Sequence, residues 1–308
     1  MEKSLYLHVG HGKTGSSYIQ SILSTHKKAI LDNCNIFYPL VQNDHSAEGK
    51  ISSGNGALFL NNPSDPVHVH NEAGENSILY SSEFLFGLQK KWINIKTINQ
   101  LFDFYDKIEV LLFIRNPDEI LSSAYQQAVK RGGYTKSIDE YSEIFNFVAE
   151  VQDFLENITR FDRINLQVFN YSNRKKDVSK ILSRWLGMDE VLDVPFPPIN
   201  RSLTYAELAL QSEINRFFGR SGDLVADDLC EKLPKIRSDV IRPGEAAWSA
   251  FYQKNLPLVG AINAMVPISE HLMLQDKIDD VRSMQTTLDV SQIRVIAQSL
   301  FGKMMRKA

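Results

Sequence analysis

The most constraining feature of this sequence is a short apolar segment that passes directly into a glycine-rich loop. Residues 5–9 are apolar and β-prone, residues 10–17 read Gly-His-Gly-Lys-Thr-Gly-Ser-Ser, and residues 18–23 have helical character. Glycine lets the backbone turn tightly and approach a ligand closely. The order of strand, tight loop and helix predicts one βα unit of an α/β fold, with a helix N-terminus pointing at the loop.

Four further segments are typical of strands, and helical patterns separate most of them. The strand candidates are residues 35–39, 77–81, 108–114 and 164–169, and the helical patterns cover residues 82–88, 117–131, 137–159 and 175–186. The run 108–114 is almost continuously apolar, which suits a central parallel strand covered on both faces. From Pro195 onward the pattern is helical, most clearly over residues 204–218.

This alternation predicts an α/β fold with a central parallel sheet of about five strands flanked by helices. The last third of the chain is expected to be helical. We expect a single domain over residues 1–308, with a core at 1–200 and a helical part at 201–308. The sequence leaves the order of the strands open.

Composition narrows the kinds of partner. The formal net charge of −3 does not suggest a nucleic-acid partner, so an anionic ligand must be attracted by local cations and backbone N–H groups. No apolar run approaches the roughly 20 residues that cross a bilayer, and the N-terminus lacks a signal-peptide pattern. The two distant cysteines, Cys34 and Cys230, fit a reducing compartment, and we expect a cytoplasmic protein.

The loop at residues 10–17 has the chemistry of an anion site. A helix N-terminus directs N–H groups and the positive end of its dipole at a bound anion. Lys13 adds a mobile positive charge, and hydroxyl donors come from Thr14, Ser16 and Ser17. The alternative interpretation is a glycine-rich turn with a solvated lysine and a serine N-cap. Because strand, loop and helix all agree with the motif, we favour a site for a phosphate or phosphosulfate.

Two features distinguish this loop from the P-loop of an ATPase or GTPase. That motif needs a glycine five positions before Gly12, but Leu7 stands there, inside the expected strand. The strand at residues 108–114 should also lead to an aspartate that holds magnesium, whereas Arg115 follows it. An arginine repels a metal ion and attracts a phosphate, so we expect no metal. A nucleotide or small-molecule kinase with a similar anion site is the alternative.

A second candidate anion site begins at Arg115, at the carboxyl end of the best strand. Ligands bind at this edge in open α/β sheets, and the guanidinium fork matches phosphate geometry. Ser123 follows eight residues later in the next helix and could contact the same ligand. Taken alone, the pair could equally be an arginine that satisfies strand-end carbonyls and a serine on a helix face of small residues.

Together these motifs resemble the sulfotransferases that use 3′-phosphoadenosine 5′-phosphosulfate (PAPS). Residues 13–17 resemble the family loop that binds the 5′-phosphosulfate, and Arg115 with Ser123 resembles the pair that binds the 3′-phosphate. The resemblance to bacterial carbohydrate-type members covers residues 4–218, loosely toward its end. It also includes His8-Val9-Gly10, Arg115-Asn116-Pro117, Tyr171, Trp185-Leu186-Gly187 and Asn200-Arg201-Ser202-Leu203.

The resemblance implies a three-layer core, PAPS as co-substrate, no metal, and an acceptor hydroxyl on a carbohydrate or glycolipid. Lys13 would stabilise the charge that develops on the leaving oxygen. Glu83, which follows the strand at 77–81, is the candidate general base, although a glutamate there could instead complement a helix dipole. The implied cofactor contacts come from Gly12, Lys13, Thr14, Gly15, Ser16, Ser17, Arg115 and Ser123.

The chain departs from the family at two points. Gly12 stands where proline is commoner, which could loosen the loop. The sequence also lacks the Arg-Lys-Gly segment near the C-terminus of animal members, and Arg201 is the substitute expected to contact the cofactor. A non-catalytic nucleotide-binding or scaffold protein is a further alternative, which the presence of Lys13 and of the pair Arg115 and Ser123 disfavours.

Acceptor contacts are expected from residues near the same sheet edge. His11 could contact the acceptor or the sulfuryl group, or it could be a solvated loop residue. Tyr134, which ends the turn 131–134, and the polar loop region 41–76 are expected to flank this edge and bind the acceptor.

Overall fold

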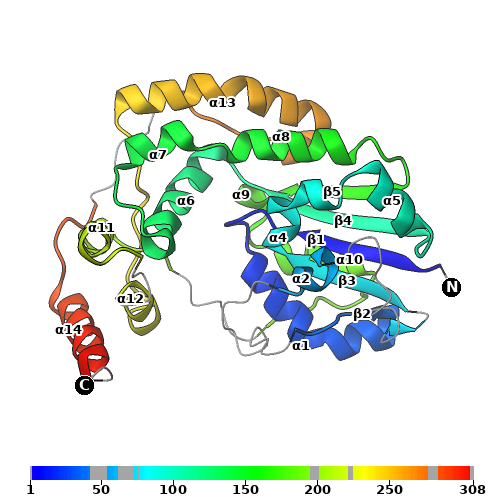
Figure 1. Ribbon diagram of the computed structural model, residues 1–308, viewed down its shortest axis with the longest axis horizontal. Helices are drawn as coiled ribbons and strands as arrows, with labels where there is room; N and C mark the ends of the chain where they lie inside the picture. The colour runs from blue at the N-terminus through cyan, green and yellow to red at the C-terminus, as the bar shows by residue number, and fades with distance from the viewer. Residues whose placement is uncertain are drawn as a thin grey trace. The chain divides into compact units, whose positions relative to one another are not determined.

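Five parallel strands form one sheet in the described part of this computed structural model (Figure 1). The described residues are 2–41, 54–61, 73–74, 76–194, 201–220, 225–276 and 284–305, so most of the loop region 41–76 lies outside them. The strands are β1 (Ser4–Val9), β2 (Ile36–Phe37), β3 (Ser77–Ser82), β4 (Lys107–Ile114) and β5 (Ile164–Asn170). The predicted α/β fold with a five-stranded parallel sheet is confirmed.

The strand order is β2-β3-β1-β4-β5, which places β1 at the centre between β3 and β4. Val9, the last residue of β1, is in register with Ser82 on one side and Leu112 on the other. From β1 the chain continues toward β2, whereas from β4 it continues toward β5. The order therefore reverses between β1 and β4, and in open α/β sheets ligands bind at the carboxyl edge beside such a reversal.

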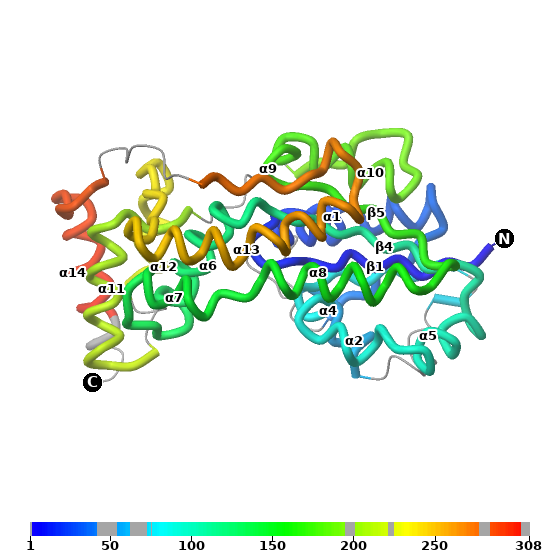
Figure 2. Tube along the Cα trace, turned by 90° about the horizontal axis from the view of Figure 1, so that it is seen from above, coloured from blue at the N-terminus to red at the C-terminus, as the bar shows by residue number. Residues whose placement is uncertain are grey.

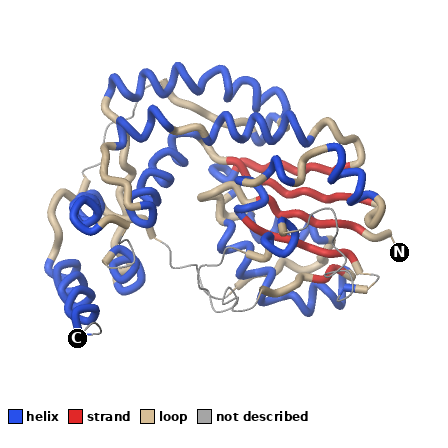
Figure 3. Tube along the Cα trace, viewed as in Figure 1, coloured by secondary structure: helices blue, strands red, loops and turns tan. Residues whose placement is uncertain are grey.

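Helices cover both faces of this sheet (Figures 2 and 3). On one face α1 (Ser16–Cys34) and α10 (Val178–Leu186) pack against Leu111 and Phe113 of β4 through Ile19, Leu23 and Trp185. The other face is lined by a chain of aromatic contacts that joins α2 (Gly56–Leu60), α4 (Glu83–Gly87) and α8 (Phe147–Ile158). Between α4 and β4 lie η2 (Gln89–Lys91) and α5 (Ile95–Phe102). Apolar cover on both faces explains why β4 is a nearly continuous apolar run.

Two of the helices predicted from the sequence differ in extent from the helices of the structure. The pattern over 137–159 forms α7 (Ile138–Ile144) and α8, because Phe145 adopts an extended conformation and packs its ring against Tyr141 and Phe251. The pattern over 175–186 begins only at Val178, after the short α9 (Tyr171–Arg174). Packing of one aromatic side chain overrides the helical periodicity in the first case.

The chain groups into two compact units that interleave along the sequence. Unit 1 comprises residues 1–116, 147–198 and 258–272 and holds the sheet; unit 2 comprises residues 117–146, 199–257 and 273–308. Unit 2 contains α6 (Pro117–Gly132), α7, α11 (Tyr205–Phe218), α12 (Ala226–Lys232), residues 245–257 of α13 (Glu245–Met265) and α14 (Val290–Met305). The described residues after 201 are helical or irregular, as expected, while the single domain stays a prediction.

No helix in the described ranges is both long and apolar enough to span a bilayer.

Candidate functional site

The glycine-rich loop occupies the carboxyl end of β1, beside the reversal of strand order. The Gly10 N–H donates to the Ser82 carbonyl over 3.1 Å, which ties the loop to β3. Lys13 and Gly15 both have left-handed backbones, with φ of 68° and 87°, so the chain turns sharply before α1. The buried Thr14 hydroxyl donates to the His11 carbonyl and closes the turn from within.

The first turn of α1 has the features of an anion site. Gly15 is its N-cap and provides no side-chain cap, and the first turn holds no acidic residue. The Ser16 hydroxyl is buried without a hydrogen-bond partner among the described residues. A Cβ on Gly10 would stand 2.7 Å from Ser16 Oγ, so only glycine fits there. An uncapped helix start beside an unpartnered hydroxyl favours a bound anion.

Arg115 joins the end of β4 to this loop. Its Nη1 donates to the Lys13 carbonyl over 2.9 Å, and the guanidinium carbon lies 5.7 Å from the centre of the Tyr171 ring. The predicted meeting of the loop and Arg115 at one sheet edge is therefore present within unit 1. Strand order explains it, because β1 and β4 are neighbours and both run toward this edge.

Tyr171 packs against the loop, a role that could not be assigned to it from the sequence. A Cβ on Gly15 would stand 2.9 Å from its ring, so the glycine allows the close approach of the tyrosine. Gly12 differs from Gly15, since a Cβ there would meet only Phe147 at 4.0 Å and its φ is not positive. A side chain would fit at position 12, and this conformation of the loop does not depend on glycine there.

Glu83 lies at the carboxyl end of β3, the position that the sequence predicted for it. It opens α4 directly after β3, its side chain is exposed, and its Cγ would be 3.2 Å from a Cβ on Gly10. The N-cap of this helix is Ser82, whose hydroxyl accepts from the Phe84 N–H. Glu83 is therefore beside the loop and also in the first turn of a helix, so the structure leaves both interpretations of this residue open.

His11 is buried, and the alternative of a solvated loop histidine is wrong. Its exposed fraction is 1%, which is as low as that of core side chains. Its ring packs edge-on against Phe86 and Phe147, with centroid distances of 4.7 and 5.3 Å. Burial lowers the pKa of His11 to about 4; a backbone interaction at Gly12 opposes the shift and Arg115 adds to it. His11 is therefore a neutral side chain beside the loop, and its ring nitrogens make no well-formed hydrogen bond to the described residues.

Gln20 is a further buried polar residue that the sequence analysis missed. It follows Ser16 by four residues and so shares its face of α1, and its amide has no partner in the described part of the chain. The signal was present: a glutamine interrupts the apolar run around Ile19 and Ile22. We refer to His11, Ser16 and Gln20 below as the unpartnered loop residues.

Ser123 and Tyr134 belong to unit 2. The Ser123 hydroxyl turns back to the carbonyls of Glu119 and Ile120 in its own helix, at 3.1 Å each. Its pairing with Arg115 stays a prediction. The Tyr134 ring packs against Tyr141 and Tyr125 with centroids 5.3 and 6.1 Å away, and burial raises the pKa of its hydroxyl. Its role in acceptor binding also stays a prediction.

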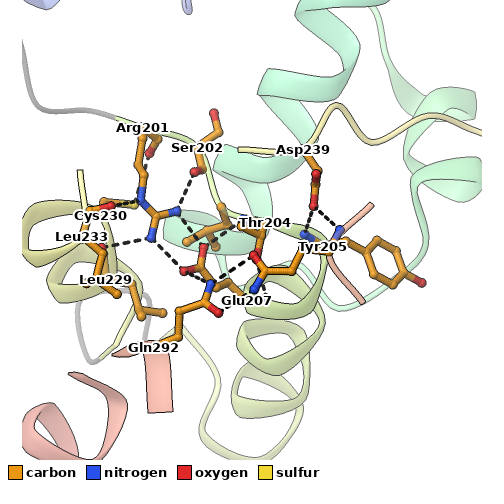
Figure 4. A network of polar contacts seen from close by, with 12 residues as sticks. Arg201, Ser202, Thr204, Tyr205, Glu207, Leu229, Cys230, Leu233, Asp239 and Gln292 are labelled. Carbon is orange, nitrogen blue, oxygen red and sulfur yellow. Dashed lines mark hydrogen bonds and ion pairs between the residues drawn. The ribbon is translucent and has the colours of Figure 1, made fainter. Parts of the chain in front are cut away.

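Arg201 has partners other than the expected phosphate (Figure 4). Its side chain is 7% exposed and forms a two-pronged ion pair with Glu207, at 2.7 Å for each prong. The remaining N–H groups donate to the carbonyls of Ser202, Leu229 and Leu233. All five guanidinium donors are used inside unit 2. Arg201 has no donor left for a phosphate, and we do not retain it as a cofactor contact.

The Arg201 network, by which we mean Arg201, Thr204, Glu207 and Gln292, is closed on its acidic side as well. Burial works against ionisation of Glu207, but hydrogen bonds from Arg201, the Thr204 N–H and Gln292 outweigh it and lower the pKa of this carboxyl. The network caps α11 and ties it to α14.

The site and fold define an α/β protein with a candidate anion loop at the strand-order reversal of a parallel sheet. No protein-family model matches the chain, and a search of curated proteins finds no significant match.

Proposed function

We propose that this protein is a sulfotransferase that moves a sulfuryl group from PAPS to an acceptor hydroxyl on a carbohydrate or glycolipid. The observation that carries the proposal is the junction of Lys13 and Arg115 at the carboxyl edge of β1 and β4. Two cations on neighbouring strand ends, next to the uncapped start of α1, suit a ligand with separated anionic groups. The motif resemblance makes PAPS the ligand of choice.

The loop residues would bind the phosphosulfate and stabilise the negative charge that develops during sulfuryl transfer. The acceptor oxygen forms a bond to sulfur as the bond from sulfur to the bridging phosphate oxygen breaks. Negative charge therefore grows on that bridging oxygen, and Lys13 with the first N–H groups of α1 would stabilise it. The acceptor proton needs a base, and we assign this role to Glu83, whose side chain lies beside the loop. His11, being neutral, could hydrogen-bond the acceptor without adding charge.

Calorimetry with 3′-phosphoadenosine 5′-phosphate (PAP), 5′-AMP and ADP tests the choice of cofactor. PAP should bind much more tightly than 5′-AMP, because only PAP carries the 3′-phosphate expected at Arg115. Arg115→Ala should remove most of the difference, since a charged hydrogen bond contributes ~1.5–3 kcal/mol. Arg115→Lys, which keeps the charge, controls for the structural bond to Lys13. Equal affinity for PAP and 5′-AMP would contradict the proposal, and magnesium-dependent ATP turnover with tighter ADP binding would favour a kinase.

Glu83→Gln tests the general base. The change keeps size and polarity but removes the proton acceptor, so PAP affinity should persist while PAPS turnover with an acceptor falls by roughly 10²-fold. Glu245→Gln, another exposed glutamate in the first turn of a helix, is the matched control for helix-dipole effects. Near-native turnover would place the base elsewhere, with His11 next to test. A drop in melting temperature beyond that of Glu245→Gln would show that Glu83 only stabilises α4.

A further inference from the structure

Asn170 ends β5 and joins it to the chain segment that follows β4. It is fully buried, and its Nδ2 donates to Asn116 Oδ1 over 3.0 Å and to the His271 carbonyl over 2.9 Å. Its Oδ1 accepts the Ser172 N–H over 3.0 Å and so caps the short helix α9. The Asn170 side chain therefore uses both of its amide N–H groups and its oxygen inside unit 1.

Two further contacts join the same segments. The Asn116 N–H donates to the Ser172 hydroxyl over 3.1 Å. Ile114, the last residue of β4, is in register with Asn170. Arg115 stands between Ile114 and Asn116, so the backbone on both sides of Arg115 is tied to the end of β5.

Glu270 anchors this junction from a distant part of the sequence. Its side chain is 3% exposed, accepts the Asn170 N–H over 2.8 Å and forms an ion pair with Arg174 of α9. Burial opposes ionisation of this carboxyl, but the hydrogen bonds from Arg174, the Asn170 N–H and Ser269 outweigh it and lower the pKa of Glu270. One carboxylate thus connects the last residue of β5 with α9. We refer to Asn116, Asn170, Ser172 and Glu270 as the Asn170 network.

The Asn170 network surrounds the base of a candidate ligand-binding side chain. Arg115 directly precedes Asn116, and its guanidinium carbon lies 5.7 Å from the ring centre of Tyr171, which stands between Asn170 and Ser172. The fork of an arginine matches two phosphate oxygens in one geometry, so binding depends on the direction of the side chain as well as on its charge. Such precision requires neighbours that fix the residue from behind.

We propose that Asn170 is a positioning residue that sets, through Asn116 and Ser172, the direction in which Arg115 presents its guanidinium to the ligand. The proposal rests on the proposed function, in which Arg115 binds the 3′-phosphate of PAPS. The alternative is a network that only stabilises the end of the sheet. Loss of a purely stabilising network would not discriminate between ligands with and without a 3′-phosphate.

Calorimetry with PAP and 5′-AMP distinguishes the two roles, since these ligands differ only in the 3′-phosphate. Asn170→Ala should lower PAP affinity about tenfold and 5′-AMP affinity by less than about twofold. In an Arg115→Ala background, the same change should alter PAP affinity by less than about twofold, because no guanidinium remains to be positioned. Equal losses of PAP affinity with and without Arg115 would overturn the proposal.

Ser172 provides a milder test, which also serves if Asn170→Ala does not fold. Ser172→Ala removes the acceptor of the Asn116 N–H and should lower the ratio of PAP to 5′-AMP affinity about threefold. Ser172→Thr keeps the hydroxyl and should restore the ratio. A native ratio in Ser172→Ala would overturn the proposal.

Asn55→Ala is the matched control. Asn55 is equally buried, its Nδ2 donates to the carbonyls of Pro39 and Leu79, and its Oδ1 accepts the Ser81 N–H, but it supports β3 instead of β4. The variant should lose stability in urea while the ratio of PAP to 5′-AMP affinity stays native. A ratio lowered as far as in Asn170→Ala would show that any buried asparagine has this effect and would overturn the positioning role.

The same titrations distinguish failure of this proposal from failure of the proposed function. If the native protein binds PAP no more tightly than 5′-AMP, the proposed function is wrong and the positioning role is wrong with it. If the native protein prefers PAP, Arg115→Ala removes the preference and Asn170→Ala keeps it, only the positioning role is wrong.

Discussion

Two buried polar regions among the described residues differ in how completely their hydrogen bonds are satisfied. In unit 2, the Arg201 guanidinium uses all five of its N–H donors. The Glu207 carboxylate accepts hydrogen bonds from Arg201, the Thr204 N–H and Gln292. In unit 1, the unpartnered loop residues His11, Ser16 and Gln20 bury polar atoms that make no well-formed hydrogen bond within the described chain. Both regions are polar and enclosed, and only the first is complete.

This difference distinguishes buried polar groups that stabilise the fold from buried polar groups that are available to a ligand. A buried polar group without a partner costs about 1–3 kcal/mol, so a set of them persists where a ligand or ordered water supplies the missing bonds. A complete network has nothing to offer a ligand, and its removal acts on stability alone unless it holds a residue that binds the ligand. The comparison therefore predicts that changes in the Arg201 network alter folding and that changes in the loop alter binding and turnover.

The largest effect is expected from Arg201→Ala. Removing one partner of a buried ion pair leaves the other uncompensated and costs about 3–5 kcal/mol, which urea denaturation can measure. Arg216→Ala breaks an exposed pair with Glu213 on the same helix and should cost at most about 1 kcal/mol. PAP affinity of the folded fraction should not change. A loss of PAP affinity with native stability would restore Arg201 as a cofactor ligand and break the comparison.

Lys13→Ala should have the opposite profile. Turnover of PAPS with an acceptor is expected to fall by about 10²–10³-fold, as for the loss of one oxyanion donor, while PAP affinity falls less. PAP lacks the sulfuryl group and so does not report the charge that develops in transfer. Lys90→Ala, which removes an exposed lysine on η2, serves as the control for net charge. Unchanged turnover in the Lys13 variant would remove this residue from the chemistry.

Acid should destabilise the loop region through His11. Burial lowers the pKa of His11 to about 4 from 6.5, so the unfolded chain takes up the proton first as the pH falls. The contribution to stability is complete above about pH 6.5 and is lost as the pH falls toward 4, on the order of 3 kcal/mol in total. His11→Asn should flatten the pH dependence of the unfolding free energy in this window. His8, whose pKa burial lowers to about 3, retains its own share of the pH dependence in this variant.

The smallest expected effect comes from two glycine substitutions, which distinguish the cost of a strained backbone from the cost of a contact with Tyr171 at the loop. Gly15→Ala and Gly187→Ala both place a side chain on a left-handed residue, at φ of 87° and 78°, and each should cost about 1–2 kcal/mol. At Gly187 no atom lies within 4 Å of the new Cβ, whereas at Gly15 the Tyr171 ring lies at 2.9 Å. Gly15→Ala should therefore also weaken PAP binding. Equal PAP affinity in the two variants would show that Tyr171 does not shape the ligand site.

The sequence predicted the parallel sheet because each strand is a short apolar segment between turn residues or helical patterns. It predicted the meeting of Lys13 and Arg115 because both follow strands that end at one edge. It could not supply the strand order, which depends on contacts between distant segments. It also could not reveal that Phe86 and Phe147 enclose His11, or that Glu207, Leu229 and Leu233 take up the donors of Arg201. These outcomes depend on packing of distant parts of the chain.

Hydrogen exchange with and without PAP compares the two regions in one experiment. If the incomplete loop is the anion site, PAP should slow exchange of the amides of residues 12–17, because the ligand supplies their missing acceptors. Amides of residues 201–207 should exchange at the same rate in both samples, since their network is already complete. Protection confined to residues 201–207, or no protection of the loop at saturating PAP, would contradict the assignment.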